Sequence, residues 1–192
     1  MKVLLINSMP EDTLSDTILV KQVCEGDRKA FGRLYEKYKE PLFRFCLRLL
    51  KNSEQAEDAV QETFFRVWTK ASAIDNPHSF RAWLFSVARF HALNNLRDRK
   101  EGQEISENDL VELDTPHEIV VRAEQTAGIM GLIELLNPQH RELILLRSFE
   151  GFSYAEISMI TGLSLSSVKV QLFNARKVLT QLHSKHQGEK PT

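Results

Sequence analysis

The stretch from Gly151 to Leu182 constrains the fold of this chain more than any other part of the sequence. Ser153 followed by Glu156 is a capping-box pattern, which predicts the start of a short helix. Gly162 stands where a helix ends in the left-handed conformation that glycine adopts at low cost. Ser164 then predicts the cap of a second, longer helix. Two helices joined by a tight glycine turn predict a helix-turn-helix, the module that places its second helix in the DNA major groove.

The second helix of this motif is predicted to be amphipathic. Its apolar residues recur with the 3.6-residue period of one buried face, at Val168, Leu172, Ala175 and Leu179. The other face collects side chains that can hydrogen-bond base edges or neutralise phosphates, namely Ser166, Ser167, Lys169, Gln171, Asn174, Arg176 and Lys177. The solvated face of an ordinary helical hairpin is the alternative, and the motif favours DNA binding.

The composition predicts an all-helical chain of one or two domains. The 192 residues contain few glycines (8) and prolines (6) and no long alternation of apolar and polar residues. No apolar stretch approaches the ~20 residues that a membrane helix needs, and the apolar run at residues 3–6 is too short for a signal peptide. We therefore expect a cytoplasmic protein without membrane insertion. Cys24 and Cys46 lie in apolar helical patterns and are predicted to be buried thiols.

Charge is distributed in blocks although the net charge is only −1. Basic residues gather between positions 81 and 100 and acidic ones between 101 and 124, which keeps a local phosphate-binding surface. Residues 101–114 lack periodicity and predict a flexible acidic linker. The predicted division is a leader at 1–14, a helical domain at 15–100, the linker at 101–114, a four-helix domain at 115–184 that contains the helix-turn-helix, and a tail at 185–192.

The N-terminal half is predicted to contain consecutive amphipathic helices. A short helix spans Ser15–Glu25, a second is capped by Asp27 and ends at Pro41, and a third begins at Pro41. The aromatic residues of this half fall at helical spacing and are assigned to the core, among them Phe31, Tyr35 and Trp68.

A separate stripe lies on the predicted helix that follows Asn52. Asp58, Gln61, Glu62 and Phe65 stand at i, i+3, i+4 and i+7 and therefore share one side of the helix. Three polar residues alone would indicate a solvated face. An exposed aromatic side chain among polar groups is typical of interfaces, so Phe65 favours a partner surface.

The predicted helix from residue 79 to residue 100 interleaves aromatic and basic side chains. Aromatic rings stack on single-stranded bases and arginines pair with phosphates, so this helix is a second candidate nucleic-acid surface. The alternative is that Phe80, Trp83, Leu84 and Val87 are core residues, and for Trp83 the core assignment is favoured.

Both halves together resemble the bacterial RNA polymerase sigma factors of the extracytoplasmic-function (ECF) group. Three stretches carry the resemblance: GDRKAFGRLYEKYKEPL from Gly26, AEDAVQETFFRVW from Ala56 joined to FRAWLFSVAR from Phe80, and PQHRELILLR, GFSYAEIS, GLS, SVK and ARKVL from Pro138 onward. Helix-turn-helix patterns are common, so each stretch alone is moderately specific. Their order and spacing make the combination strongly specific.

The resemblance implies a promoter-specificity subunit with no catalysis, cofactor, metal or small-molecule substrate of its own. Its partners would be core RNA polymerase, promoter DNA and an anti-sigma factor. The helix with Asp58, Gln61 and Glu62 would dock on the clamp helices of the largest polymerase subunit, in agreement with the stripe that includes Phe65. The loop at 71–79 would accept a flipped base of the minus-ten element.

The resemblance also assigns DNA-contacting residues. Those on the minus-ten element would be Asn76, Ser79, Arg81, Arg89, Asn94, Asn95, Arg97 and Arg99. Those on the minus-thirty-five element would be Ser166, Ser167, Lys169 and Gln171 in the groove, with Arg147, Arg176 and Lys177 on phosphates, and Asn174 is assigned to the same element. The second helix departs from many family members, which are more basic where this chain has Val170, Gln171, Phe173 and Asn174. Fewer cations predict weaker sequence-independent affinity for DNA.

Two other classes of protein are weighed against this interpretation. A stand-alone helix-turn-helix regulator with a helical sensor domain would not need the Asp58–Trp68 stripe or the basic helix after it. An enzyme would need a recognisable site, and the sequence has no glycine-rich phosphate loop, no metal-spaced His/Cys set and no nucleophile motif.

Overall fold

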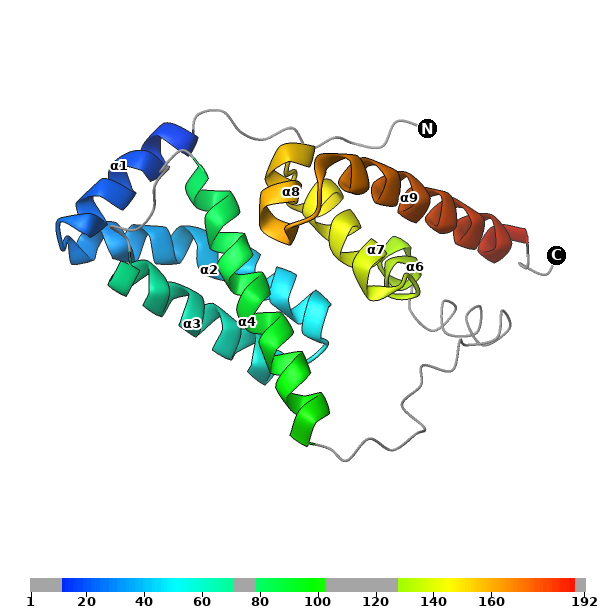
Figure 1. The fold of residues 1–192 in the computed structure, drawn as a ribbon, viewed down its shortest axis with the longest axis horizontal. Coiled ribbons are helices and arrows are strands. Elements are labelled where there is room, and N and C mark those ends of the chain that lie inside the picture. The colour runs from blue at the N-terminus through cyan, green and yellow to red at the C-terminus, as the bar shows by residue number, and fades with distance from the viewer. Residues whose placement is uncertain (1–11, 71–78, 103–127, 189–192) are drawn as a thin grey trace. The chain divides into compact units, whose positions relative to one another are not determined.

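The computed structural model describes residues 12–70, 79–102 and 128–188, and each element within these ranges is a helix (Figure 1). The chain divides near Asn95 into two compact units. The predicted all-helical fold with two domains is confirmed. Most of the predicted linker, and the loop at 71–78, lie outside the described residues.

The N-terminal unit contains α1 (Asp12–Cys24), α2 (Arg28–Leu50), α3 (Ser53–Lys70) and α4 (Phe80–Gly102). Local capping sets the helix starts. The Asp27 carboxylate accepts hydrogen bonds from the backbone N–H groups of Lys29 and Ala30, at 2.7 and 3.3 Å, and so begins α2. The Asn52 side chain accepts from the N–H of Gln55 at 2.9 Å and begins α3 in the same way.

The prediction that one helix ends and another begins at Pro41 is wrong. α2 runs without interruption through Pro41. A proline inside a helix removes a backbone hydrogen bond and costs about 3 kcal/mol. The buried stripe of Leu34, Tyr38 and Leu42 continues past Pro41 to Phe45, and burial of this apolar face along the whole helix offsets the cost.

The core of this unit lies where α2, α3 and α4 meet. Phe45 on α2 packs against Phe85 on α4 with ring centroids 5.3 Å apart, and Tyr38 packs edge-on against Phe80 at 5.7 Å. Phe80 and Phe85 are both fully buried. These contacts hold α4 against α2. In Figure 1, α4 is the green helix that crosses α2.

Helix α1 joins the unit through one apolar side and one buried carboxylate. Its Leu19, Val20 and Val23 are buried against the rest of the unit. Cys24 follows Val23 by one residue and therefore points about 100° away, which leaves it exposed. The prediction that both cysteines are buried is confirmed for Cys46 and wrong for Cys24.

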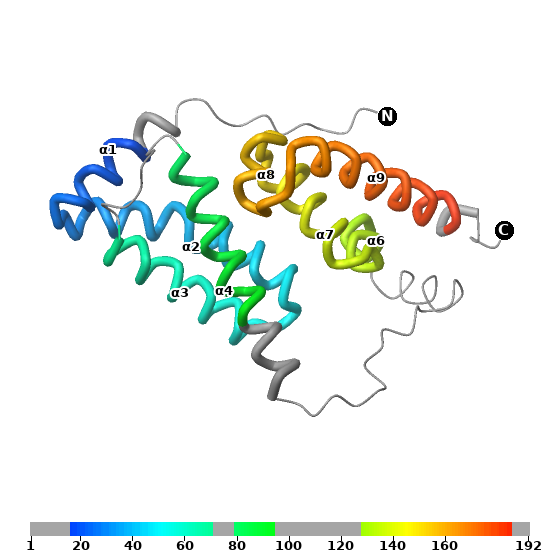
Figure 2. Tube along the Cα trace, viewed as in Figure 1, coloured from blue at the N-terminus to red at the C-terminus, as the bar shows by residue number. Residues whose placement is uncertain are grey.

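The C-terminal unit contains α6 (Ile129–Glu134), α7 (Pro138–Ile144), a π-helical segment η4 (Leu145–Phe149), α8 (Tyr154–Thr161) and α9 (Leu165–Gly188). Asn137 caps α7 by accepting from the N–H of His140 at 2.8 Å, and Pro138 lies in the first turn. The predicted four-helix domain at 115–184 is described only from residue 128, and its first described helix is α6. Figure 2 shows the tight turn by which the trace passes from α8 into α9.

In the described residues no helix is long and apolar enough to cross a membrane. The same residues contain no group of three or more His, Cys, Asp or Glu side chains that could hold a metal ion.

Candidate functional site

The helix-turn-helix is built by the local signals that the sequence contains. Ser153 accepts from the N–H of Glu156 at 3.2 Å, and the Glu156 carboxylate accepts from the N–H of Ser153 at 2.7 Å, which completes the capping box of α8. Gly162 ends α8 with φ +74°, in the left-handed region. The Ser164 hydroxyl accepts from the N–H of Ser167 at 3.2 Å and begins α9.

Helix α9 separates a buried face from an exposed one. Val168, Leu172 and Ala175 are buried, as predicted. The exposed candidates for DNA contact are Ser166, Lys169, Asn174, Arg176 and Lys177. These five side chains are accessible to a DNA groove and its phosphates.

Three candidates for contact with the minus-thirty-five element are less accessible than the sequence suggests. Gln171 is half-buried, and its side-chain oxygen is buried without a hydrogen-bond partner. Ser167 is half-buried, and its hydroxyl lies 2.8 Å from the Ser164 hydroxyl at the helix cap. Arg147 donates to the Phe152 carbonyl at 2.8 Å and lies over the Tyr154 ring at 5.0 Å. Arg147 therefore braces the turn that leads into α8.

The stripe on α3 is exposed along its whole length. Asp58, Gln61, Glu62 and Phe65 are all exposed, and the Phe65 side chain retains 63% of its accessible surface. Contact between an apolar ring and water is unfavourable. For an aromatic side chain this exposed, only a partner that covers the ring can remove that contact. The structure thus brings the four predicted residues together on one face.

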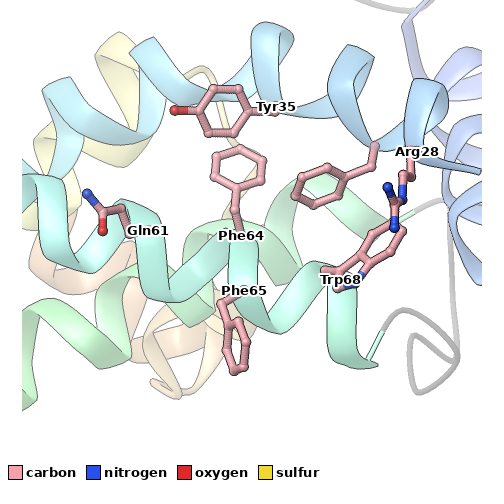
Figure 3. Close-up of a pocket in the computed structure, with 7 residues that line it drawn as sticks. Arg28, Tyr35, Gln61, Phe64, Phe65 and Trp68 are labelled. Carbon is pink, nitrogen blue, oxygen red and sulfur yellow. The ribbon is translucent and has the colours of Figure 1, made fainter. Parts of the chain in front are cut away.

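Beside this stripe a trough opens between α2 and α3, with a volume of about 530 Å³ (Figure 3). The lining residues of this α2–α3 trough are Arg28, Phe31, Tyr35, Gln61, Phe64, Phe65 and Trp68. Its wall is mainly aromatic: the Phe31 and Trp68 rings lie 5.3 Å apart, and the Tyr35 and Phe64 rings 4.8 Å apart. Gln61 and Phe65 belong to both the stripe and the trough, so the two form one continuous surface.

Tyr35 and Trp68 belong to this surface, although their helical spacing predicts both as core residues. Both are exposed, Trp68 by 40%. The position of Tyr35 around the axis of α2 is the sequence signal that could have predicted its exposure. Leu34 and Tyr38 belong to the buried stripe, and Tyr35 is rotated from Leu34 by about 100°, toward α3 and the solvent.

The candidates for the minus-ten element are only partly described. Ser79, just before α4, is half-buried, as are Arg81, Arg89 and Asn94 on α4, and the Arg81 guanidinium lies over the Phe85 ring at 5.5 Å. Asn76 and the side chains of Asn95, Arg97 and Arg99 lie outside the described residues. Phe80, Leu84 and Val87 are buried, as the core assignment predicts, and Trp83 is half-buried.

An aromatic and basic cluster lies where α3 meets α4. Phe90 is exposed, with the Arg66 guanidinium 5.4 Å above its ring and the His91 ring 5.5 Å away. Burial lowers the pKa of His91, the Arg66 charge lowers it further, and the nearby Glu62 opposes both. His91 is therefore predominantly neutral at pH 7. Arg66 supplies the positive charge of this cluster.

Comparison with known proteins gives matches over both units. Residues 34–101 match the family described as sigma-70 region 2, and residues 127–179 match sigma-70 region 4. The chain is 30% identical over 183 residues to the RNA polymerase sigma factor NccH of Alcaligenes xylosoxydans xylosoxydans, covering 89% of this chain and 96% of NccH. It is 27% identical over 172 residues to the ECF RNA polymerase sigma factor SigW of Bacillus subtilis, covering 83% and 92%.

The match to a longer relative is partial. The chain is 26% identical to the ECF RNA polymerase sigma factor BldN of Streptomyces coelicolor over 169 residues, which span 64% of BldN.

Two solved structures are similar to this fold. One is CnrH in complex with the cytosolic domain of CnrY, at TM-score 0.64 and 26% identity, covering 89% of this chain and 98% of that chain. The other is the sigma factor RpoE in complex with the anti-sigma factor NepR from Bartonella quintana, at TM-score 0.65 and 25% identity, covering 81% and 98%.

Proposed function

The chain belongs to the ECF RNA polymerase sigma factors of the sigma-70 family, and from this premise we propose which of its surfaces meet polymerase and promoter. As a sigma factor it directs RNA polymerase to promoters and is not an enzyme. The polymerase supplies the chemistry, so the task of this chain is recognition. Each surface can therefore be judged by what it can bind.

The α3 stripe and the α2–α3 trough together form the proposed polymerase-binding surface. The observation that carries this proposal is the 63% exposure of Phe65 among Asp58, Gln61 and Glu62. Hot spots of protein interfaces combine an exposed aromatic anchor with polar groups at its rim. Tyr35 and Trp68 extend the aromatic part across the trough, so we include them in the surface.

The promoter-binding surfaces lie on α4 and α9. Exposed Ser166, Lys169 and Asn174 are proposed to enter the major groove of the minus-thirty-five element, with Arg176 and Lys177 on phosphates. Ser79, Arg81, Arg89 and Asn94 are proposed to lie along the minus-ten element, together with residues of the same segment outside the described ranges. Half-buried Gln171 is the least accessible candidate for contact with bases of the minus-thirty-five element, because its side-chain oxygen is enclosed.

The two units are proposed to act together on one promoter, as ranges 15–100 and 115–184 tethered by the acidic residues 101–114. Joining two modules raises the effective concentration of the second at its site. The place of action would be the cytoplasm, where a bacterial polymerase and its promoters are found.

An anti-sigma factor is the proposed regulator of this chain. Support comes from the similar RpoE structure, in which that sigma factor is in complex with the anti-sigma factor NepR. An exposed aromatic surface on a protein that must also bind polymerase is a site where such a partner can compete.

Transcription in vitro tests the proposed polymerase surface. The purified chain, sigma-free core polymerase and genomic fragments are expected to yield specific transcripts that depend on the chain. Asp58→Arg and Phe65→Ala are expected to abolish these transcripts and polymerase binding. Glu40→Arg, which makes the same charge change as Asp58→Arg on an exposed part of α2, is the matched control and should retain both.

Two outcomes would contradict the assignment. Unchanged polymerase affinity in a folded Asp58→Arg variant would remove the α3 stripe from the interface. Tight, specific duplex binding by the chain alone, without initiation, would favour the stand-alone regulator.

A further inference from the structure

Two apolar side chains stand on the exposed face of α9 among its polar and basic residues. Phe173 is 68% exposed and Val170 is 59% exposed, and Phe173 is the most exposed large apolar residue in the described part of the chain. Both follow Ser166 and Lys169 within the first turns of the helix. Neither belongs to the buried stripe of Val168, Leu172 and Ala175, so packing within the unit does not account for them.

The charge around this pair favours DNA as its partner. Helix α9 contains no Asp or Glu, and Lys169, Arg176 and Lys177 surround the two apolar side chains. A surface with cations only is complementary to phosphates, whereas protein interfaces are depleted of lysine at their centre. Gln171 is poorly placed to read a base by hydrogen bonding, because its side-chain oxygen is buried.

We propose that Val170 and Phe173 read thymine in the upstream promoter element by contact with its C5-methyl group. This inference rests on the proposed insertion of α9 into the major groove. Valine and phenylalanine cannot exchange hydrogen bonds with base edges. The thymine methyl is the apolar feature that the major groove offers, and only T·A and A·T pairs carry it.

The geometry limits where those thymines lie. Val170 and Phe173 are three residues apart, which corresponds to a rise of about 4.5 Å along the helix. Stacked base pairs are about 3.4 Å apart. The two contacts therefore fall on the same or neighbouring base pairs, no more than about two pairs apart. Asn174, which is exposed next to Phe173, can pair with an adenine edge in the same short segment.

Deoxyuridine substitution tests the inference, because it removes the methyl group and keeps the base pairing. The holoenzyme of core polymerase and full-length chain is first used to select its promoter from a duplex library randomised across the upstream element. Each thymine of that element is then replaced singly by deoxyuridine. Replacement at one or two neighbouring positions is expected to lower the affinity of the holoenzyme for the duplex about fourfold. This factor corresponds to the free energy of burying one methyl-sized group.

Variants assign the effect to the two side chains. Val170→Ser and Phe173→Ser are expected to weaken the thymine promoter and to become insensitive to deoxyuridine at their positions. Lys169→Ala should weaken binding and its salt dependence but keep the deoxyuridine effect, since it removes a cation and leaves both apolar side chains in place. Unchanged circular dichroism is expected for all three, because the side chains are exposed.

The outcomes separate this inference from the function on which it rests. If no deoxyuridine position matters while Lys169→Ala still weakens upstream recognition, the methyl contact is wrong and the groove assignment stands. If Lys169→Ala and scrambling of the upstream element are both without effect, α9 does not read DNA and both fail. Loss of a protein partner in Phe173→Ser with normal DNA binding would also overturn the methyl contact.

Discussion

A single buried carboxylate joins α1 to the rest of its unit. Asp16 is 3% exposed, and its two oxygens accept hydrogen bonds from the Lys37 ammonium group at 2.7 Å and from the Tyr38 hydroxyl. Burial of an ionised carboxylate is costly unless partners compensate it. Because Asp16 lies on α1 and both donors lie on α2, the position of α1 depends on this residue.

Asp16→Ala is expected to reduce the free energy of unfolding of the N-terminal unit by about 1–3 kcal/mol, the cost of losing the acceptor of a buried hydrogen bond. Denaturant unfolding followed by tryptophan fluorescence measures it, since Trp68 and Trp83 both lie in this unit. Glu40→Ala, which removes only the exposed pair with Arg44, is the control and should cost about 0.5 kcal/mol or less. Equal midpoints for both variants would refute a structural role for Asp16.

The two cysteines are expected to differ sharply in reactivity. Burial raises the pKa of the Cys46 thiol from 9.0 to about 12, whereas Cys24 is exposed. A thiolate is the reactive form, so a thiol reagent at pH 8 should modify Cys24 quickly and Cys46 only when the unit unfolds. Cys24→Ser should therefore abolish the fast phase, and two equally fast thiols would contradict the burial of Cys46.

The raised pKa of Cys46 also makes the free energy of unfolding depend on pH. The folded state holds the thiol proton more tightly than the unfolded state does. This contribution to stability is therefore complete below about pH 9 and is lost as the pH rises toward 12.

At the scale of helices, the sequence predicts those features that depend on neighbouring residues. The capping box of Ser153 and Glu156 and the turn at Gly162 are confirmed, because their hydrogen bonds and dihedral angles are local. Pro41 and Tyr35 were predicted wrongly, because tertiary packing decides whether a helix continues through proline and which of its sides faces a neighbour.

The same limit applies to the candidate site. The α3 stripe was predicted because one helical face contains it, and all four side chains are exposed. The α2–α3 trough was not predicted, because it needs two helices in contact. Gln171 shows the reverse case: helical spacing alone placed it with the exposed residues, and packing encloses its oxygen.

Loss of the α8 cap is expected to loosen the first helix of the helix-turn-helix. Ser153→Ala removes the acceptor for the Glu156 N–H and should cost about 1 kcal/mol. Hydrogen exchange of the α8 amides should accelerate about fivefold where the helix opens locally. Glu156→Gln, which keeps a capping-box side chain, is the control with near-normal exchange. Unaltered exchange in Ser153→Ala would mean that tertiary contacts alone hold α8.

For the whole molecule, the arrangement of charge implies that promoter binding depends on polymerase. The net charge is −1, and the exposed cations of α9 between residues 165 and 177 are Lys169, Arg176 and Lys177. Few phosphate contacts give weak affinity when a module binds alone. Attachment of both units to one polymerase would supply the missing affinity as effective concentration.

The isolated chain is accordingly expected to bind an upstream duplex only with the affinity of non-specific binding, Kd about 10⁻⁴–10⁻⁶ M at physiological salt. In the holoenzyme the affinity should rise by about 10²–10⁴. Fluorescence anisotropy with a labelled duplex measures both. Asp58→Arg should leave the weak binding of the isolated chain unchanged and remove the gain. Nanomolar, sequence-specific binding by the isolated chain would contradict this dependence.

The exposed indole in the α2–α3 trough gives the molecule an optical property. The sequence has two tryptophans: Trp68 lines the trough and is 40% exposed, and Trp83 is half-buried on α4. A partner that fills the trough removes water from the Trp68 ring, so the emission maximum should shift to shorter wavelength when a tryptophan-free partner binds. Trp68→Phe should abolish the shift and Trp83→Phe should keep it. The chain would thus report, by its own fluorescence, whether the proposed polymerase-binding surface is occupied.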